Sequence, residues 1–216
     1  MMSLNKDLKK LQKDVLSSLP PDISKELIIE NKKLFSKFFE DKALAKGQVA
    51  PDVLFRDKNL NPVYLKNLLK DHHIVLSFFR GTWCPYCNME LNYLNKINHD
   101  INNKDARLIA VSPELYKHME EKITKSNLDF PVFTDLGNIA ANEFGLVFEL
   151  PPKYRELYTK LSFHLNVLNG EDKWTLPLPA TFIISKDGVI TASYINADYT
   201  TRMEPADILS ELDKLN

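Results

Sequence analysis

The sequence predicts an α/β fold in which helices cover both faces of a mixed central sheet. Two continuous apolar runs, HIVLSFF at 73–79 and ARLIAVS at 106–112, are typical of buried strands, and each is followed by a helical pattern. A third stretch, 180–196, holds two β-rich runs around Asp187-Gly188, which is a strong hairpin signal. The alternation of strands and helices that ends in a hairpin therefore indicates a mixed sheet.

The first 45 residues predict a helical extension that precedes the main domain, residues 46–216. Apolar residues recur at helical spacing on both sides of a Pro20-Pro21 break. They are Leu4, Leu8, Leu11 and Val15, and then Ile23, Leu27, Leu34 and Phe38. The pattern favours either a surface that packs on the main domain or a contact with a second copy of the chain, so a homodimer is one of two alternatives.

Shorter elements connect the apolar runs of the main domain. They are two short strands and a helix within 53–69, helices over 84–97 and from about Pro113, a short edge strand at 131–135 and a closing helix over 204–215. Residues 144–174 are mostly helical in pattern and predict an insertion. Within it, Asn169-Gly170-Glu171-Asp172 is typical of a loop.

The composition limits the possible ligands. Lys and Arg number 28 against 29 Asp and Glu, so no bulk positive charge is present to hold a nucleic acid or an anionic membrane. No apolar run is long enough for a signal peptide or a membrane span, and we therefore expect a cytoplasmic protein. The six glycines form no phosphate-binding motif, so we expect no nucleotide cofactor.

Cys84 and Cys87 are the only cysteines, and they lie where the first apolar run gives way to a helical pattern. Pro85 suits the first helical position, so Cys84 is expected at a helix N-terminus, where the helix dipole favours a thiolate. We expect Cys84 to face solvent and Cys87 to point toward the sheet. One alternative is a zinc site, but the sequence offers no second pair of ligands for the metal. The other alternative is that the two cysteines are buried and unreactive.

The segment Trp83-Cys84-Pro85-Tyr86-Cys87 resembles the active-site segment of the thioredoxin superfamily. A longer ordered set of motifs resembles the peroxiredoxin-like branch of the alkyl hydroperoxide reductase and thiol-specific antioxidant (AhpC/TSA) family. It comprises Gly47-x-x-Ala50-Pro51-Asp52, Phe79-Arg80-Gly81-x-Trp83-Cys84-Pro85-Tyr86-Cys87-x-x-Glu90-Leu91, Pro179-Ala180-Thr181-Phe182 and Asp198-Tyr199-x-x-Arg202-x-Glu204-Pro205. The resemblance implies a thioredoxin fold and an antioxidant or thiol-redox enzyme with a redox-active disulfide.

The chain departs from a typical peroxiredoxin at two places. Cys87 with the following Glu90 matches the peroxidatic position, but Cys84 stands where the family carries a threonine. Pro179-Ala180 stands where it carries an arginine. Pro179 instead matches the cis-proline that faces the active-site disulfide in this fold, and the alternative is an ordinary trans proline that opens a strand.

Other side chains are expected to supply the charge that the missing arginine would give. Tyr199 and Arg202 follow the second hairpin strand, which in this fold ends on the active-site side, so we expect them to approach the cysteines. Arg202 could stabilise a thiolate and Tyr199 could donate a hydrogen bond. Arg80 is a second candidate, and surface salt bridges are the alternative for both arginines.

Three functions fit these residues. In a dithiol peroxidase, Cys87 attacks a hydroperoxide and Cys84 condenses with the sulfenic acid to form a disulfide. In a general thiol-disulfide oxidoreductase, Cys84 attacks a protein disulfide and Cys87 resolves the mixed intermediate. Either enzyme would need a thioredoxin- or glutathione-type reductant. The third function is a non-enzymatic redox sensor.

Overall fold

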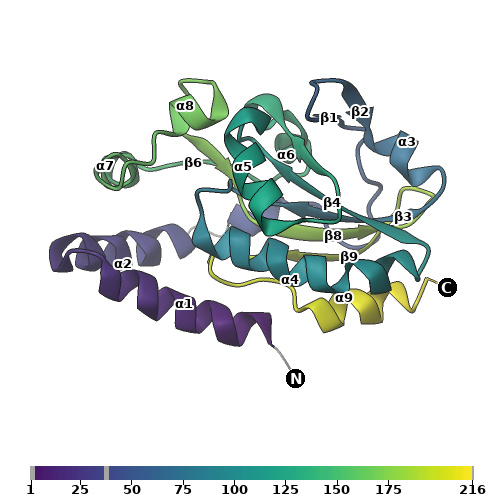
Figure 1. Ribbon diagram of the computed structural model, residues 1–216, viewed down its shortest axis with the longest axis horizontal. Helices are drawn as coiled ribbons and strands as arrows, with labels where there is room; N and C mark the ends of the chain where they lie inside the picture. Colours follow the sequence, from purple (N-terminus) through teal and green to yellow (C-terminus); the bar gives the residue numbers. More distant parts are fainter. Residues whose placement is uncertain (1–2, 37–38, 216) are drawn as a thin grey trace.

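The computed structural model describes residues 3–36 and 39–215, and Phe38 of the sequence pattern lies outside them. A seven-stranded sheet with the order β2-β1-β5-β4-β3-β8-β9 forms its centre (Figure 1). The strands are β1 (Leu54–Arg56), β2 (Pro62–Tyr64), β3 (His73–Phe78), β4 (Ala106–Ser112), β5 (Val132–Thr134), β8 (Ala180–Ile184) and β9 (Ile190–Ile195). Because β3 pairs parallel with β4 and antiparallel with β8, the predicted mixed sheet is confirmed.

Helices cover both faces of this sheet. They are α1 (Leu4–Ser18), α2 (Pro21–Phe35), α3 (Leu65–Leu69), α4 (Pro85–Asn102), α5 (Tyr116–Ser126), α6 (Ile139–Glu143), α7 (Pro152–Lys160), α8 (Leu165–Asn169) and α9 (Pro205–Leu212). Short 3₁₀ turns span Phe39–Lys42 and Leu136–Asn138. None of the helices in the described residues combines the length and the apolar character that crossing a bilayer requires.

Alternate residues of β3 enter two separate apolar cores, as the two-residue period of a strand requires. Ile74, Leu76 and Phe78 lie in one core, which α2, α3, α6, α7 and α8 cover. Val75, together with Phe79 directly after the strand, lies in the other, which α1, α4, α5 and α9 cover. Burial on both faces explains why the run at 73–79 is continuously apolar rather than alternating.

Two sequence-based expectations about strands were wrong. The strand at 131–135 is not an edge strand, since β5 lies between β4 and β1 in the sheet. The insertion is not only helices and loop, because β6 (Val147–Glu149) pairs antiparallel with β7 (Thr175–Pro177) in a second, two-stranded sheet. Both errors concern three-residue strands whose partners are distant in sequence, so no local period identifies them.

The α1–α2 pair lies at the end of the molecule where α4 begins, close to α7 (Figure 1). Glu204 accepts hydrogen bonds from the backbone N–H groups of Leu4 and Asn5, both at 2.9 Å. The Asn5 side chain also bonds the backbone of Arg202, donating to its carbonyl at 2.7 Å and accepting from its N–H at 2.9 Å. These contacts fix the first turn of α1 to the loop that precedes α9.

Candidate active site

The two cysteines lie at the start of α4, in the loop that leaves β3. Cys84 is the N-cap residue of α4 and Pro85 is its first residue, as the sequence predicts. Gly81 has φ +153°, and a Cβ at this position would lie 2.2 Å from the Trp83 indole nitrogen. The loop therefore needs glycine there to fold the Trp83 ring back beside the cysteine.

Both cysteines are reduced and 0% exposed, so the expectation that Cys84 faces solvent was wrong. The cover comes from side chains that are distant in sequence. Tyr199, from the loop after β9, packs on Arg80, and Tyr158 of α7 packs against Trp83. A local pattern of helix exposure could not reveal this cover.

Arg80 contacts the sulfur of Cys84 directly. Its Nη2 lies 2.9 Å from Cys84 Sγ, and its Nη1 donates to the Tyr158 hydroxyl at 2.9 Å. The guanidinium also stacks on the Tyr199 ring, with 3.8 Å between Cζ and the ring centroid. Arg80 is 3% exposed, so the alternative of a surface salt bridge was wrong for this residue.

Arg202 lies beside the second cysteine, with 3.5 Å between its Nη2 and Cys87 Sγ. Its Nε forms an ion pair with Glu90, and both residues are 1% exposed. Its Nη1 donates to the carbonyls of Tyr199 and Thr201. The expected approach of Arg202 to the cysteines is confirmed, and its salt bridge is buried rather than at the surface.

The environment drives the two thiol pKa values apart. Burial opposes ionisation of Cys84, but a hydrogen bond from Cys87 and the positive charge of Arg80 outweigh it and hold the Cys84 pKa well below its usual range. Burial and the neighbouring Cys84 thiolate raise the Cys87 pKa well above its usual range. The two directions favour a thiolate on Cys84 over one on Cys87.

Two buried carboxyl groups lie near the pair. Burial raises the pKa of Glu90 to about 7, against the opposing charge of Arg202. Glu114 accepts hydrogen bonds from the backbone N–H of Thr82 at 2.6 Å and from its hydroxyl at 2.9 Å. Glu114 thereby holds the loop that leads to Cys84. Residues 113–115 lie outside the helix that was expected to begin near Pro113, since α5 begins at Tyr116.

Two supporting residues differ from expectation. The Tyr199 hydroxyl donates to Asn31 of α2 at 3.0 Å, so its ring, rather than its hydroxyl, faces the site through Arg80. No cis peptide bond occurs in the described residues, so the Leu178–Pro179 bond is trans and the cis expectation was wrong. The backbone is extended where it passes from β7 to β8, and the N–H of Leu178 donates to the carbonyl of Leu146. The chain therefore does not need to change direction at Pro179.

Tyr158 and Asn31, like Glu114, are site residues that the sequence did not reveal. Tyr158 holds Arg80, and Asn31 accepts hydrogen bonds from Tyr199 and Tyr154. Each lies in a helix whose apolar spacing indicated only packing. The polar residue Asn31 on the inner face of α2 is a weak signal, since a buried amide needs partners.

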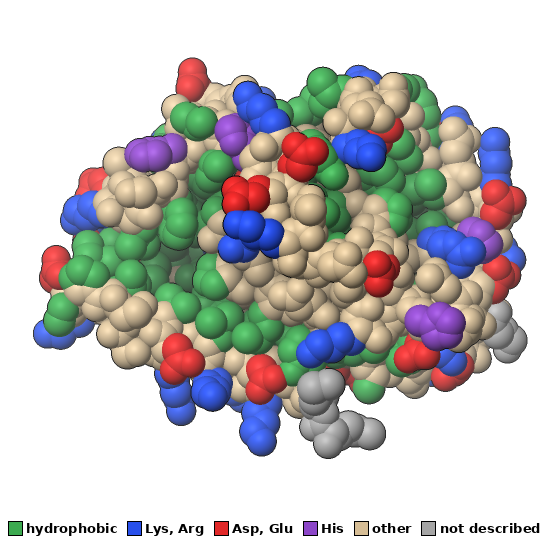
Figure 2. Space-filling view, viewed as in Figure 1, with side chains coloured by type: hydrophobic (Ala, Val, Ile, Leu, Met, Phe, Trp, Pro, Cys, Tyr) green, Lys and Arg blue, Asp and Glu red, His purple; other side chains and the backbone are tan. Residues whose placement is uncertain are grey.

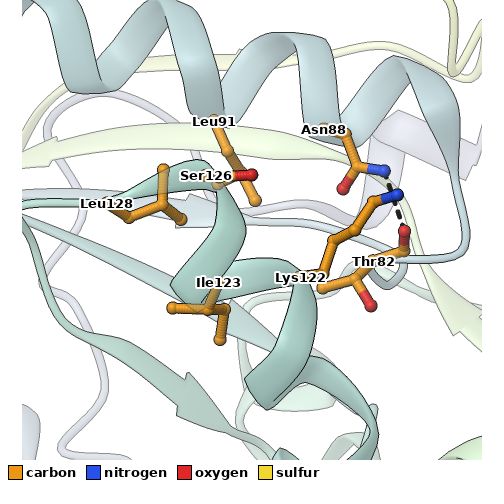
Figure 3. Close-up of a pocket in the computed structure, with 7 residues that line it drawn as sticks. All are labelled: Thr82, Asn88, Leu91, Lys122, Ile123, Ser126 and Leu128. Carbon is orange, nitrogen blue, oxygen red and sulfur yellow. Dashed lines mark hydrogen bonds between the residues drawn. The ribbon is translucent and has the colours of Figure 1, made fainter.

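Of two cavities near the loop that carries the cysteines, one is large enough for a small molecule. Between α4 and α5, Figure 3 shows a hollow in which Asn88 donates to the Thr82 carbonyl at 2.8 Å. This hollow measures about 10 Å³, close to the minimum for one water molecule. On the opposite side, a pocket of about 130 Å³ is lined by Trp83 and Pro85, which flank Cys84, together with side chains of α1, α2 and α7. Neither cysteine lines that pocket, but Arg80, which contacts the Cys84 sulfur, does.

The mixed sheet, the flanking helices and the Cys-x-x-Cys at the start of α4 define a protein of the thioredoxin superfamily. The AhpC/TSA family model matches residues 46–193, and the chain belongs to this family.

Individual relatives come from two groups. The chain is similar to the thiol-disulfide oxidoreductase ResA of Bacillus thuringiensis, with 25% identity over 173 residues that cover 79% of this chain and 82% of the relative. Its fold is similar to a peroxiredoxin-like protein from Aquifex aeolicus, at TM-score 0.64 and 18% identity over 81% of this chain and 89% of that one. It is also similar to peroxidoxin BcpB from Mycobacterium tuberculosis, at TM-score 0.63 and 18% identity over 80% and 99% of the two chains.

Proposed function

We propose that the protein is a peroxiredoxin-like dithiol peroxidase in which Cys84 attacks the hydroperoxide and Cys87 resolves the product. The contact between Arg80 and the Cys84 sulfur carries this proposal, because it favours a thiolate at neutral pH. The guanidinium can also donate to a peroxide oxygen as charge develops on it. Arg80 then fills the role of the arginine that the family carries at the position of Pro179-Ala180.

The reaction runs in two steps. The Cys84 thiolate attacks the terminal oxygen of the hydroperoxide, the O–O bond breaks, and the alkoxide takes a proton to leave as an alcohol, or as water from hydrogen peroxide. Cys84 is then a sulfenic acid. The Cys87 thiol condenses with it, which forms the disulfide and releases water. A thioredoxin- or glutathione-type thiol reductant supplies the two electrons that reopen the disulfide.

This assignment reverses the roles that the family resemblance implied, where Cys87 was the peroxidatic thiol. The 2.9 Å contact of Arg80 with the Cys84 sulfur supports the reversal, and the opposite directions of the two pKa shifts agree with it. A thiol with a raised pKa is a poor nucleophile at neutral pH but a suitable resolving group once its neighbour has been oxidised.

A second candidate function is thiol-disulfide exchange with protein substrates. The similarity to a protein named as a thiol-disulfide oxidoreductase favours it, and a thiolate on the first cysteine of Cys-x-x-Cys suits it. Burial of both sulfurs opposes it, since a folded protein disulfide would need the covering helices to move.

A stopped-flow titration of the reduced protein with hydroperoxide separates the two functions. The peroxidase should lose two thiols per hydroperoxide consumed. Cys87→Ser should still react and stop at a sulfenic acid on residue 84, whereas Cys84→Ser should lose the fast reaction. A protein that is inert to hydroperoxides but rapidly reduces insulin disulfides would overturn the proposal in favour of the second candidate.

A further inference from the structure

The pocket beside Cys84 is partly built from residues that precede the family-matched region, 46–193. Val15 of α1, Leu19 of the α1–α2 connection and Leu27 of α2 form one wall. Leu161 and Phe163, which follow α7, form another. Figure 2 shows hydrophobic side chains gathered around a hollow between the α1–α2 pair and α7.

Two residues that line this pocket each carry a buried hydrogen-bond donor that lacks a partner among the described residues. Arg80 is 97% buried, and although its Nη atoms bond Cys84 and Tyr158, its Nε has no acceptor. The indole Nε1 of Trp83 is buried without an acceptor as well. A buried donor without a partner is costly, so the Arg80 guanidinium keeps unused capacity for an oxygen acceptor beside the pocket that Arg80 lines.

The size of the pocket limits the rest of the ligand. An apolar cavity of ~150 Å³ in another protein binds benzene. The volume here is about 130 Å³, and apart from Arg80 and the tyrosine hydroxyls its lining carries no polar side-chain group other than the Trp83 indole. An apolar body about the size of one six-membered ring therefore fits, with its polar end at Arg80.

We propose that α1 and α2 form the binding site for the apolar body of the substrate and thereby set its specificity for hydroperoxides with a compact body of about one ring. The proposal rests on the peroxidase function proposed above. It assigns specificity to Val15, Leu19 and Leu27, which do not touch the reacting atoms. Hydrogen peroxide, which has no such body, gains nothing from these residues.

The test compares cumene hydroperoxide with hydrogen peroxide in stopped-flow experiments on the reduced full-length chain. The wild type should react faster with cumene hydroperoxide. Val15→Ala combined with Leu19→Ala should lower the ratio of the two rate constants about tenfold, with the hydrogen peroxide rate unchanged. Leu16→Ala is the matched control, since Leu16 packs on the core beside Val15 without lining the pocket, and it should leave the ratio unchanged.

A binding measurement decides the inference even if the chain is not a peroxidase. Calorimetric titration with 2-phenylpropan-2-ol, the unreactive alcohol of the same shape, should show binding that Val15→Phe abolishes by filling the pocket. A ratio that the alanine variants leave unchanged, while both peroxides react, would overturn the inference and leave the proposed function standing. Inertness to both peroxides would refute the function, and alcohol binding lost in Val15→Phe would still support the site. Absence of alcohol binding would overturn it.

Discussion

Each cysteine of the site has its own arginine, but the two arginines differ in their partners. Arg80 contacts Cys84 and is held by a tyrosine hydroxyl and an aromatic ring, and no described carboxylate pairs with it. Arg202 contacts Cys87 but is paired with the buried Glu90. Since both sulfurs are equally buried, burial does not explain why one pKa falls and the other rises.

The difference teaches that local pairing modulates how strongly each arginine favours a thiolate. Both arginines lower the pKa of both thiols, but Glu90 offsets part of the charge of Arg202, whereas no described carboxylate offsets that of Arg80. Ionisation of Cys84 also places a negative charge beside Cys87 and so opposes a second thiolate. The two halves of the site are therefore coupled, and changes to either arginine environment test the comparison.

Removing the charge of Arg80 should have the largest effect. In Arg80→Gln the opposing effect of burial dominates, the Cys84 pKa rises, and the rate of hydroperoxide reaction at pH 7 should fall by about 10- to 1,000-fold. Stopped-flow rates measure this change. Arg107→Gln is the control, because Arg107 bonds Asn102 and the Ala106 carbonyl at the far end of β4. A rate within twofold of the wild type would break the comparison.

Removing the carboxylate beside Arg202 should bring the pKa values of the two thiols closer together. In Glu90→Gln the charge of Arg202 acts on Cys87 without the offsetting carboxylate, and we expect the Cys87 pKa to fall. The pH dependence of alkylation in a Cys84→Ser background measures this pKa. Glu121→Gln, which breaks an exposed ion pair with Lys125, should leave it unchanged. An unaltered Cys87 pKa in Glu90→Gln would show that the ion pair does not restrain Arg202.

Loosening Arg80 without changing its charge should have a smaller effect. Tyr158→Phe removes the hydroxyl that accepts from Nη1 and keeps the ring against Trp83. Loss of one hydrogen bond to a charged group, worth about 1.5–3 kcal/mol, is shared with other Arg80 contacts, so we expect a severalfold decrease in the hydroperoxide rate. Tyr116→Phe on α5 provides a control. An unchanged rate would mean that the Tyr199 ring alone positions Arg80.

Releasing α1 from the Arg202 loop should have the smallest effect on chemistry and a measurable one on stability. Asn5→Ala removes both side-chain bonds to the Arg202 backbone, and we expect the free energy of unfolding to fall by about 1–2 kcal/mol. Urea denaturation measures it. Asn88→Ala, which removes one hydrogen bond on the opposite side of the loop, serves as a comparison. A large loss of peroxide reactivity in Asn5→Ala would extend the Arg202 half of the site to α1.

The sequence predicted the parts of the site that depend on local pattern. A buried strand followed by Pro85 is sufficient to place Cys84 at a helix N-terminus, and the hairpin signal locates the loop that carries Arg202. The family resemblance predicted that Tyr199 approaches the cysteines, but the sequence could not predict the full cover over the thiols, because Tyr158 lies more than 70 residues after Cys84 in a helix whose pattern indicates only packing. It also could not show that Arg202, and not Arg80, is the arginine with a carboxylate partner.

Titration of the two thiols is the most direct test of the central claim. Reduced protein labelled with ¹³C at cysteine Cβ gives one NMR signal for each thiol, and Cys84→Ser and Cys87→Ser assign them. The Cys84 signal should titrate below the ordinary thiol pKa of ~8.5, so that Cys84 is a thiolate at neutral pH and loses reactivity only as the pH falls through its own lowered pKa. Cys87 should titrate well above it. The reverse order, or two pKa values near ~8.5, would contradict the account.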